Sequence, residues 1–437
     1  MKKVTLKRII SILLALILTF SALSSLTSCR IVFGPFSSDG AGDGAGGGAG
    51  GGAGDQTPSD NNGAGGDETG GGAPEFFPTD EGASIENLSS AQIALLSAVK
   101  IVATFEVYTG YGTSTATAIQ YGSGLIYKLD KGTGDAYVIT NYHVVNNKNS
   151  KSSSKASSDI ALYLYGQEGE PYKIKATYLG GSMSYDTAVL RVKGSEVLKN
   201  SYARAVTLGN SDTLVPLDSV VAIGAPNRQC LAVTEGIVSV DSEDLPMLGA
   251  DGYTQVTLRV MRISAAINEG NSGGGLFDAS GKLIGIVVAK KTGSEIDNMA
   301  YAIPINLAKN TADAIIHYCD GETNTSLYKC FLDFIPGAEV TGLVIDSESG
   351  KIFKAEKVIV ESILDGSILS GIIGIGDVIN SITVDGVKKE VTRSYHVLDH
   401  MMTARVGSTV TLNITRDDIT FDTHPVTLTE STKQAVK

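Results

Sequence analysis

Residues 268–278 read Asn-Glu-Gly-Asn-Ser-Gly-Gly-Gly-Leu-Phe-Asp, and they place one hydroxyl group, that of Ser272, among residues with little side-chain bulk. Glycines let the backbone turn sharply and let a substrate approach closely. Such a turn can aim the amides of Gly270 and Ser272 at one point, as an oxyanion hole requires. An ordinary glycine-rich turn has the same composition, so a nucleophilic role for Ser272 depends on finding a base and an acid elsewhere.

A base for Ser272 is available in His143, which alone among the five histidines precedes Ser272 in the chain. It follows the apolar run 136–142, and the sequence turns polar at Asn146. We therefore expect His143 at the end of a buried strand, facing a cleft. An isolated histidine of this kind is often a core residue, but together with the Ser272 motif it is predicted to be the general base.

Two aspartates are candidates for the acid that orients the histidine. Asp159 and Asp186 each begin an apolar run that is typical of a strand. Asp159 follows the Ser/Lys-rich stretch 150–158 and is predicted to be a solvated residue at the start of a strand. Asp186 is predicted to accept a hydrogen bond from the imidazole of His143 and to fix its tautomer. The order His143, Asp186, Ser272 is the chymotrypsin-type order.

Several further blocks stand in order along the chain. They are Gly-Ser-Gly-Leu-Ile at 122–126, Val-Ile-Thr-Asn-Tyr-His-Val-Val at 138–145, Asp-Thr-Ala-Val-Leu at 186–190, Ala-Ile-Gly-Ala-Pro at 222–226, Glu-Gly-Ile-Val-Ser at 235–239 and Tyr-Ala-Ile-Pro-Ile at 301–305. Over residues 90–430 they resemble an HtrA/Deg-type serine protease, a trypsin-like domain followed by a PDZ domain. The resemblance implies that His143 is the general base, Asp186 its orienting acid and Ser272 the nucleophile, with an oxyanion hole formed by the amides of Gly270 and Ser272.

The chain departs from this family at three positions near the nucleophile. The family usually has proline where Glu269 and Gly275 stand, and an acidic residue where Ser264 stands. None of the three is a member of the predicted triad. The reaction class is therefore unchanged, but the resting geometry of the loop and its activation are left open.

The strand after the nucleophile resembles the wall of the family's S1 pocket. It contains Val287, Val288 and Ala289, and these apolar side chains would favour small or medium aliphatic P1 residues in a substrate. A run of this kind is also typical of plain core, and both interpretations stay open at this stage.

Short β-type runs dominate the rest of the chain, so the predicted fold class is mainly β. Strands are expected at 101–107, 124–129, 137–143, 160–165, 187–192, 220–223 and 283–289. They predict a chymotrypsin-like double β-barrel, a trypsin-like serine protease domain over 89–317 closed by a helix at 307–317, followed by an interdomain linker at 318–335.

Residues 336–430 resemble a PDZ domain, a small α+β unit. Strands are expected at 358–363 and 410–415, a further core segment at 371–382 and a helix at 396–405. The resemblance implies that C-terminal peptides bind by adding to a sheet edge. The loop expected at 341–344, with Gly342, Leu343 and Val344, resembles the carboxylate-binding loop; an ordinary strand entry is an equal alternative.

The N-terminal residues indicate where the protein works. Basic residues precede an apolar stretch at 9–20, which is too short to span a membrane and is typical of a secretory signal. Leu-Thr-Ser-Cys at 26–29 resembles a bacterial lipobox, although an ordinary signal peptide followed by a chance cysteine fits too. We thus predict a lipoprotein signal peptide at 1–28 and lipidation of Cys29. The mature protein would be membrane-anchored on the extracytoplasmic face of a bacterial envelope.

A linker is predicted between the lipidated cysteine and the protease domain. Residues 37–74 are mostly Gly, Ala, Asp, Ser and Asn without a large apolar side chain, so they cannot bury a core. We therefore expect residues 29–88 to form a disordered tether. HtrA relatives work as trimers or larger assemblies, and Phe76 and Phe77, just after the linker, are candidates for a subunit contact.

Charge and cysteine content exclude several other functions. The formal net charge is −12, and it becomes −16 when the four basic residues of 1–28 are removed, since that segment holds no acidic residue. This balance argues against nucleic acid as a partner. Cys230, Cys319 and Cys330 lack the spacing of metal ligands, and a bridge between Cys319 and Cys330 is an open alternative. No Walker-type loop appears, so neither metal, cofactor nor ATP is expected.

Two functional classes fit these observations. The first is an ATP-independent serine endopeptidase that degrades misfolded exported proteins, with the PDZ domain binding substrates or regulatory C-terminal peptides. The alternative is a latent protease that acts as a tethered chaperone or PDZ binding protein. The intact triad and the glycine-rich turn favour the first class, because a pure binding protein has no chemical need for them.

Overall fold

The computed structural model describes residues 88–110, 114–288, 299–319 and 325–436. All of these lie in one compact unit, Gly70–Lys437. The predicted signal peptide, Cys29, the glycine-rich linker, Phe76 and Phe77 lie outside the described residues, and so does Ala289.

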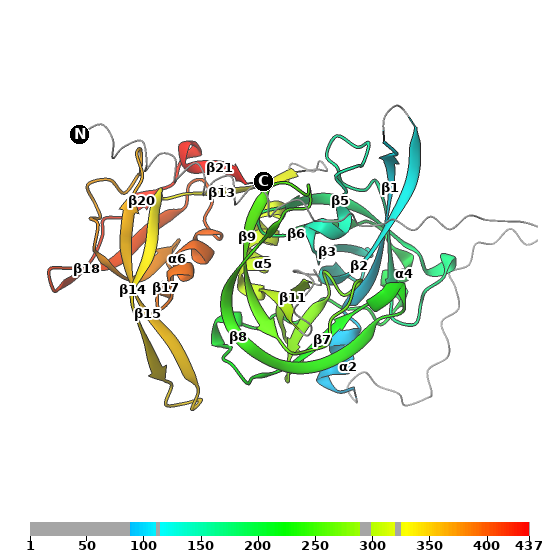
Figure 1. The fold of residues 1–437 in the computed structure, drawn as a ribbon, viewed down its shortest axis with the longest axis horizontal. Helices are drawn as coiled ribbons and strands as arrows, with labels where there is room; N and C mark the ends of the chain where they lie inside the picture. The colour runs from blue at the N-terminus through cyan, green and yellow to red at the C-terminus, as the bar shows by residue number, and fades with distance from the viewer. Residues whose placement is uncertain (1–87, 111–113, 289–298, 320–324, 437) are drawn as a thin grey trace, which may run out of the picture. The chain divides into compact units, whose positions relative to one another are not determined.

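The first barrel is built from six consecutive strands. They are β1 (Ala98–Tyr108), β2 (Thr115–Asp130), β3 (Asp135–Thr140), β4 (Asp159–Leu164), β5 (Ile174–Ser182) and β6 (Thr187–Val192), shown in Figure 1. Their order is β5-β4-β1-β2-β3-β6, and a pairing of β5 with β6 closes the ring. β1 alternates buried and half-exposed residues along most of its length, as a strand with one face on a core should.

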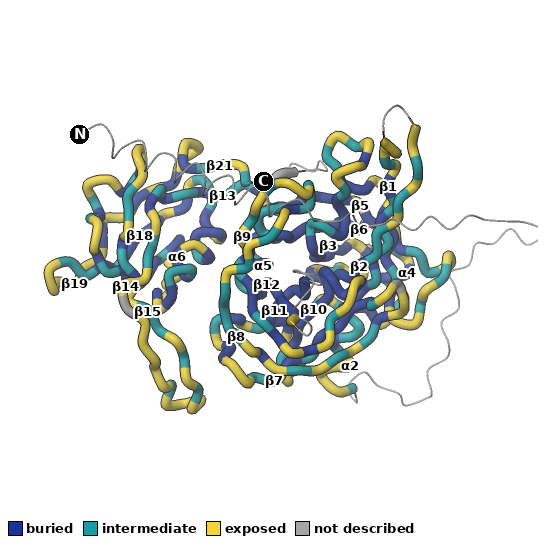
Figure 2. Tube along the Cα trace, viewed as in Figure 1, coloured by how far each residue is buried: buried dark blue, intermediate teal, exposed yellow. Residues whose placement is uncertain are grey.

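The second barrel is a closed ring of β7 (Ser219–Gly224), β8 (Ala232–Leu248), β9 (Gln255–Ile263), β10 (Gly275–Asp278), β11 (Leu283–Val288) and β12 (Ala300–Pro304). Leu125 and Ile139 of the first barrel share one core cluster with Ile223, Phe277 and Ile286 of the second. β10 and β11 are accordingly buried (Figure 2). The predicted mainly β, double-barrel fold is confirmed.

Among the described residues of the two barrels, the helices are mostly short. They are α2 (Ser90–Leu95), α3 (Tyr142–Val145), α4 (Glu196–Asn200) and α5 (Ile305–His317), with 3-10 turns η2 (Glu170–Tyr172), η3 (Ser211–Thr213) and η4 (Pro226–Arg228). The helix predicted at 307–317 is α5, which begins two residues earlier, directly after Pro304. Its buried face, including Leu307, Ala312 and Ile315, packs on the shared core.

The C-terminal domain is a separate sheet with one helix. Its elements are β14 (Phe334–Ile345), β15 (Ile352–Ile363), β16 (Val378–Val384), β17 (Val387–Glu390), α6 (Ser394–Met401), β18 (Thr409–Arg416), β19 (Ile419–Asp422), β20 (Val426–Thr427) and η5 (Glu430–Thr432). The helix predicted at 396–405 ends earlier, because the amides of residues 402–404 bond to carbonyls three residues back instead of four. The run at 371–382 forms a strand only from Val378.

The loop predicted at 341–344 is wrong. Gly342, Leu343 and Val344 lie within β14 and pair with Ala355, Lys354 and Phe353 of β15. The chain reverses later, where the Asp346 carboxylate accepts hydrogen bonds from the amides of residues 348 and 349, a local bond that favours a turn.

The segment 318–335, predicted as a linker, contains strand β13 (Thr325–Cys330). β13 pairs in parallel with β5 of the first barrel, and β21 (Lys433–Val436) returns to pair with β13. Both ends of the C-terminal domain are therefore attached to the sheet of the first barrel.

Two further features concern the membrane and the thiols. Among the described residues, no helix is long and apolar enough to cross a bilayer. Cys330 is a free thiol buried in the core of the C-terminal domain, so the bridge to Cys319 left open above is not formed.

Among the histidines in the described part of the chain, His396 of α6 has the most strongly shifted pKa. Its ring is buried, and Nδ1 accepts a hydrogen bond from the Thr392 amide at 3.3 Å. Burial lowers the pKa of His396 to about 4, although the neighbouring Asp212 carboxylate opposes this shift. The imidazole is therefore neutral in the folded protein at neutral pH.

We predict that His396 makes stability fall with acid. Between pH 6.5 and about 4 the unfolded chain binds a proton at this histidine and the folded chain does not, so the free energy of unfolding decreases as pH falls, by at most about 3 kcal/mol. The variant His396→Gln should lack this component. Urea unfolding of both proteins at pH 7 and pH 5 measures the difference, and equal pH dependence in the two would contradict the prediction.

Candidate active site

The three predicted triad residues come from three different connections between strands. The strand predicted to end at His143 is β3, which ends earlier, at Thr140. His143 therefore lies on the short helix α3. Asp186 occupies the turn between β5 and β6, and Ser272 the turn between β9 and β10. The double barrel brings these connections together, although they are far apart in the sequence.

The side chains form a continuous hydrogen-bonded chain. His143 Nδ1 lies 2.8 Å from Asp186 Oδ2 and 3.0 Å from Oδ1, and His143 Nε2 lies 2.9 Å from Ser272 Oγ. A carboxylate only accepts, so Nδ1–H donates to Asp186 and Nε2 is left to accept from the serine hydroxyl. The arrangement can take a proton from Ser272 as that oxygen attacks a carbonyl carbon.

Backbone contacts hold Asp186 in place. The amide of His143 donates to Asp186 Oδ1 at 3.1 Å, and Asn141 Nδ2 donates to the Asp186 carbonyl at 2.9 Å. The backbone of Asp186 is left-handed, with φ of 42°, a conformation that aspartate tolerates better than most residues. By contrast, Asp159 lies exposed at the start of β4, as predicted.

Ser123 connects the first barrel to the nucleophile turn. Its hydroxyl donates to the Gly270 carbonyl at 2.7 Å and accepts from the Ala225 amide at 2.8 Å. Its own amide donates to the Ser272 carbonyl at 2.8 Å. Ser123 is fully buried, so these bonds have no competition from water. The serine therefore fixes the nucleophile turn from the opposite barrel.

The turn needs glycine at two positions in particular. Gly270 and Gly273 have φ of 98° and 82°. A Cβ atom on Gly270 would collide with the Ala225 carbonyl oxygen, and one on Gly273 with the Ser123 carbonyl oxygen. Positive φ and close backbone approach together exclude any larger residue.

A backbone hydrogen bond orients the N–H group of Gly270, which is predicted to belong to the oxyanion hole. The amide of Asn227 donates to the Glu269 carbonyl at 2.7 Å. Because C=O and N–H of a trans peptide point in opposite directions, this bond turns the Gly270 N–H away from Asn227. Asn227 itself is left-handed, with φ of 53°. The contact uses only the backbone of Glu269, so the absence of proline there does not prevent it.

The other two departures from the family pattern also have local explanations. A Cβ atom on Gly275 would collide with the ring of Phe277, so the Phe277 ring occupies the space that a larger residue would need. Ser264 Oγ accepts a hydrogen bond from the Ile237 amide at 3.0 Å. Gly275 therefore leaves room for the Phe277 ring, and Ser264 binds the backbone of the neighbouring strand.

Val287 and Val288 of β11 are each 1 % exposed and belong to the core clusters. The Val287 carbonyl accepts from the Gly273 amide at 2.9 Å, and its amide donates to the Gly274 carbonyl at 2.8 Å. β11 thus runs directly beside the nucleophile turn.

Sequence reasoning missed the supporting residues. Ser123 stands between two glycines inside a strand, a pattern that marks close backbone approach, and Asn227 follows a proline, a pattern that marks a turn. Neither pattern reveals a partner more than 40 residues away. No group of three or more His, Cys, Asp or Glu suited to a metal ion occurs among the described residues.

Two barrels with a His-Asp-Ser chain between them define a trypsin-like serine peptidase. Consistent with this, residues 122–286 match the family description "Trypsin-like peptidase domain".

Sequence relatives narrow the class further. Serine protease Do-like HtrA of Lactococcus lactis subsp. cremoris (strain MG1363) is 34% identical over 192 residues, which cover 42% of this chain and 42% of the relative. Serine protease Do-like HtrA of Bacillus subtilis (strain 168) is 34% identical over 197 residues, which cover 45% of this chain and 39% of the relative. The chain spans about two fifths of the length of these curated relatives.

A solved structure, "HtrA-type protease AlgW with decapeptide", aligns with 78% of this chain and 97% of its own chain, at 21% identity and a TM-score of 0.47. Together with the domain match, the sequence relatives support an HtrA/Deg-type serine protease, and the catalytic domain is that of a serine-type endopeptidase.

We predict that Ser123→Ala weakens both stability and catalysis. The change leaves the Ala225 amide and the Gly270 carbonyl without their buried partner, and each loss costs about 1–3 kcal/mol of stability. Loosening the turn should also lower kcat/KM by about tenfold or more. Urea unfolding and peptide hydrolysis measure the two effects. The matched control is Ser431→Ala, on the surface; a Ser123 variant that behaves like the control would refute the role of Ser123.

Proposed function

We propose that this protein is an ATP-independent serine endopeptidase of the bacterial cell envelope that degrades misfolded exported proteins. The observation that carries the proposal is the hydrogen-bonded chain from Asp186 through His143 to Ser272. A binding protein with a latent protease fold has no need for this geometry.

In the proposed mechanism, Ser272 Oγ attacks the carbonyl carbon of the scissile bond while His143 Nε2 takes its proton. The negative charge that develops on the carbonyl oxygen is stabilised by the N–H groups of Gly270 and Ser272. His143 then gives its proton to the leaving amine. Water, deprotonated by the same nitrogen, hydrolyses the acyl-enzyme and releases Ser272.

The substrate's P1 side chain is proposed to lie against β11. Val287 borders the nucleophile turn through its contacts with Gly273 and Gly274, and Val288 and Ala289 follow it in the chain. An apolar strand at this place favours small or medium aliphatic P1 residues. Both valines are buried in the core, so they would shape the pocket chiefly by setting the position of the strand.

The C-terminal domain is proposed to be a PDZ domain that binds C-terminal peptides of substrates or regulators. Among the strands that the structure describes, β14 pairs with β15 alone, so its other edge can accept an added strand. Gly342, Leu343 and Val344 lie on this edge strand, and the side chains of Leu343 and Val344 are exposed.

The location in the envelope is proposed from the N-terminal sequence. A signal peptide at 1–28 and a lipid on Cys29 would anchor the protein in the membrane, and residues 29–88 would form its tether. Assembly into a homotrimer or a larger oligomer belongs to the same proposal.

We expect the full chain, purified in mild detergent, to cleave reduced casein without ATP. Ser272→Ala should abolish turnover by several orders of magnitude and leave casein binding largely intact, because the hydroxyl is needed only for the chemical step. Gel analysis of cleavage and a binding assay separate the two effects.

Casein cleavage that persists in Ser272→Ala would show a contaminating protease. Binding without cleavage by the wild-type chain, even with added C-terminal peptides, would instead support the tethered chaperone.

A further inference from the structure

The turn that carries Asp186 begins with residues that have no role in the triad. Tyr185 directly precedes Asp186, and its carbonyl accepts a hydrogen bond from Thr187 Oγ1 at 2.9 Å. The half-buried side chain of Tyr185 packs against the core shared by the two barrels. A shift of Tyr185 must therefore move the backbone on both sides of Asp186.

The hydroxyl of Tyr185 is held by a residue from the connection to the C-terminal domain. Lys329 Nζ donates to Tyr185 Oη at 2.6 Å. The ammonium group also lies 5.3 Å from the centre of the Tyr185 ring and 4.4 Å from that of Phe331. Among the described residues, no carboxylate lies within ion-pair distance of Lys329. Tyr185 and Phe331 thus set the position of this cation.

Strand β13, which carries Lys329, is bound to the same segment by its backbone. Thr325 and Ser326 pair with Gly180 and Gly181 at the end of β5. The segment from Gly180 to Asp186 is therefore held by β13 at both ends, first by the backbone and then by Lys329. The residue after Lys329 is Cys330, which is already part of the core of the C-terminal domain.

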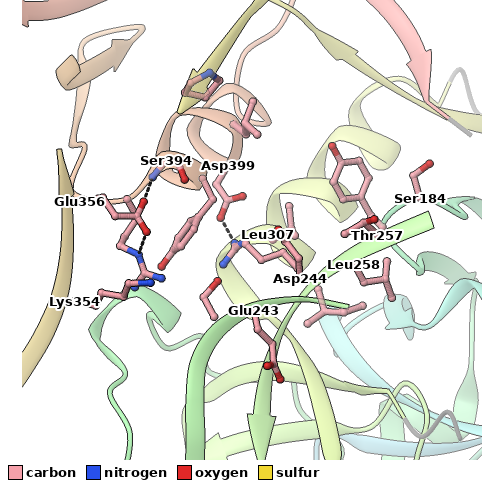
Figure 3. A pocket seen from close by; sticks show the side chains of 18 residues that line it. Ser184, Glu243, Asp244, Thr257, Leu258, Leu307, Lys354, Glu356, Ser394 and Asp399 are labelled. Atoms are coloured by element: carbon pink, nitrogen blue, oxygen red, sulfur yellow. Dashed lines mark hydrogen bonds and ion pairs between the residues drawn. The ribbon is translucent and has the colours of Figure 1, made fainter. Parts of the chain in front are cut away.

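Part of the turn faces an open space. Ser184 and Tyr185 line a cavity of about 410 Å³, whose other walls include Leu307 of α5, Glu356 of β15 and Asp399 of α6. Figure 3 shows Ser184 and Glu356 at opposite ends of the group of lining residues, with Leu307 and Asp399 between them. Close packing does not fix the turn from this side, so the bond to Lys329 carries more of its positioning.

We propose that Lys329 and Tyr185 are positioning residues for Asp186, through which strand β13 sets the alignment of the triad. The inference rests on the proposed function. It assigns a positioning role to Lys329, which lies on β13, outside the two barrels. When the bond between Lys329 and Tyr185 is lost, Asp186 no longer holds the His143 imidazole in line with Ser272. Proton transfer slows, while substrate binding is unaffected, because neither residue belongs to the triad or to the strand proposed to contact the substrate.

The test compares four variants of the full chain with the wild type, using a fluorogenic peptide with an aliphatic P1 residue. Lys329→Met and Tyr185→Phe both remove the bond, and Tyr185→Phe keeps the ring. We expect each to lower kcat by about tenfold with KM within about twofold of the wild type. Lys329→Arg keeps a cationic donor and should retain most of the activity. Lys388→Met, on the exposed strand β17, is the matched control and should match the wild type.

A second readout reports the alignment directly. The proton on His143 Nδ1, bound to Asp186, should give a downfield NMR resonance in the wild type that broadens or disappears in Tyr185→Phe. Unchanged kcat and an unchanged resonance in a folded Tyr185→Phe protein would overturn the inference. The resonance does not require turnover, so a wild-type chain that cleaves no peptide would contradict the proposed function while the resonance still decides the role of Tyr185.

Discussion

The catalytic geometry depends on the buried hydrogen bonds of Ser123, which tie the nucleophile turn of one barrel to a strand of the other. The hydroxyl binds Gly270 and Ala225, and the amide binds the Ser272 carbonyl. Thr140 Oγ1 in turn donates to the Ser123 carbonyl at 2.7 Å, beside the helix that carries His143. Ser123 of β2 thus fixes the position of the Ser272 turn relative to the segment that precedes His143. Any change in how the barrels pack would alter the 2.9 Å separation of His143 and Ser272, and catalysis depends steeply on that separation.

Backbone hydrogen bonds also explain how the turn accommodates its departures from the HtrA pattern and how the C-terminal domain is attached. The turn is oriented by backbone bonds, such as that from Asn227 to Glu269, and a backbone bond tolerates side-chain changes at the position that accepts it. The C-terminal domain is attached through β13 and β21 to the sheet that also carries the triad acid. A binding event in that domain therefore has a covalent and hydrogen-bonded route to Asp186, through Lys329 and Tyr185.

The sequence predicted the residues proposed to carry out the reaction, but it did not predict the residues that hold them in position. Ser272, His143 and Asp186, which the structure brings within hydrogen-bond distance of one another, could be selected because each stands in a local pattern that acyl transfer requires. The strands were recognisable from their apolar runs. Ser123, Asn227 and Lys329 act on partners distant in the chain, and no local pattern specifies such a pair. The loop expected at Gly342 failed for a related reason: the turn is determined by Asp346 further along, whose bonds to residues 348 and 349 outweigh the glycine. The end of β3 was misplaced by a few residues because the apolar run 136–139 was extended through the polar pair Thr140 and Asn141, whereas the strand ends at Thr140 and Asn141 is the N-cap of α3.

The most direct test of this account is the rate at which a fluorophosphonate labels Ser272 in the full chain with no added peptide. Labelling requires a serine activated by its histidine, and it requires neither the C-terminal domain nor a protein substrate. We expect complete modification, mapped by mass spectrometry to Ser272 and lost in His143→Ala, at a rate that added C-terminal peptides do not raise by more than a few fold. Labelling that is absent until such a peptide is added would contradict the claim that the folded chain holds an assembled triad.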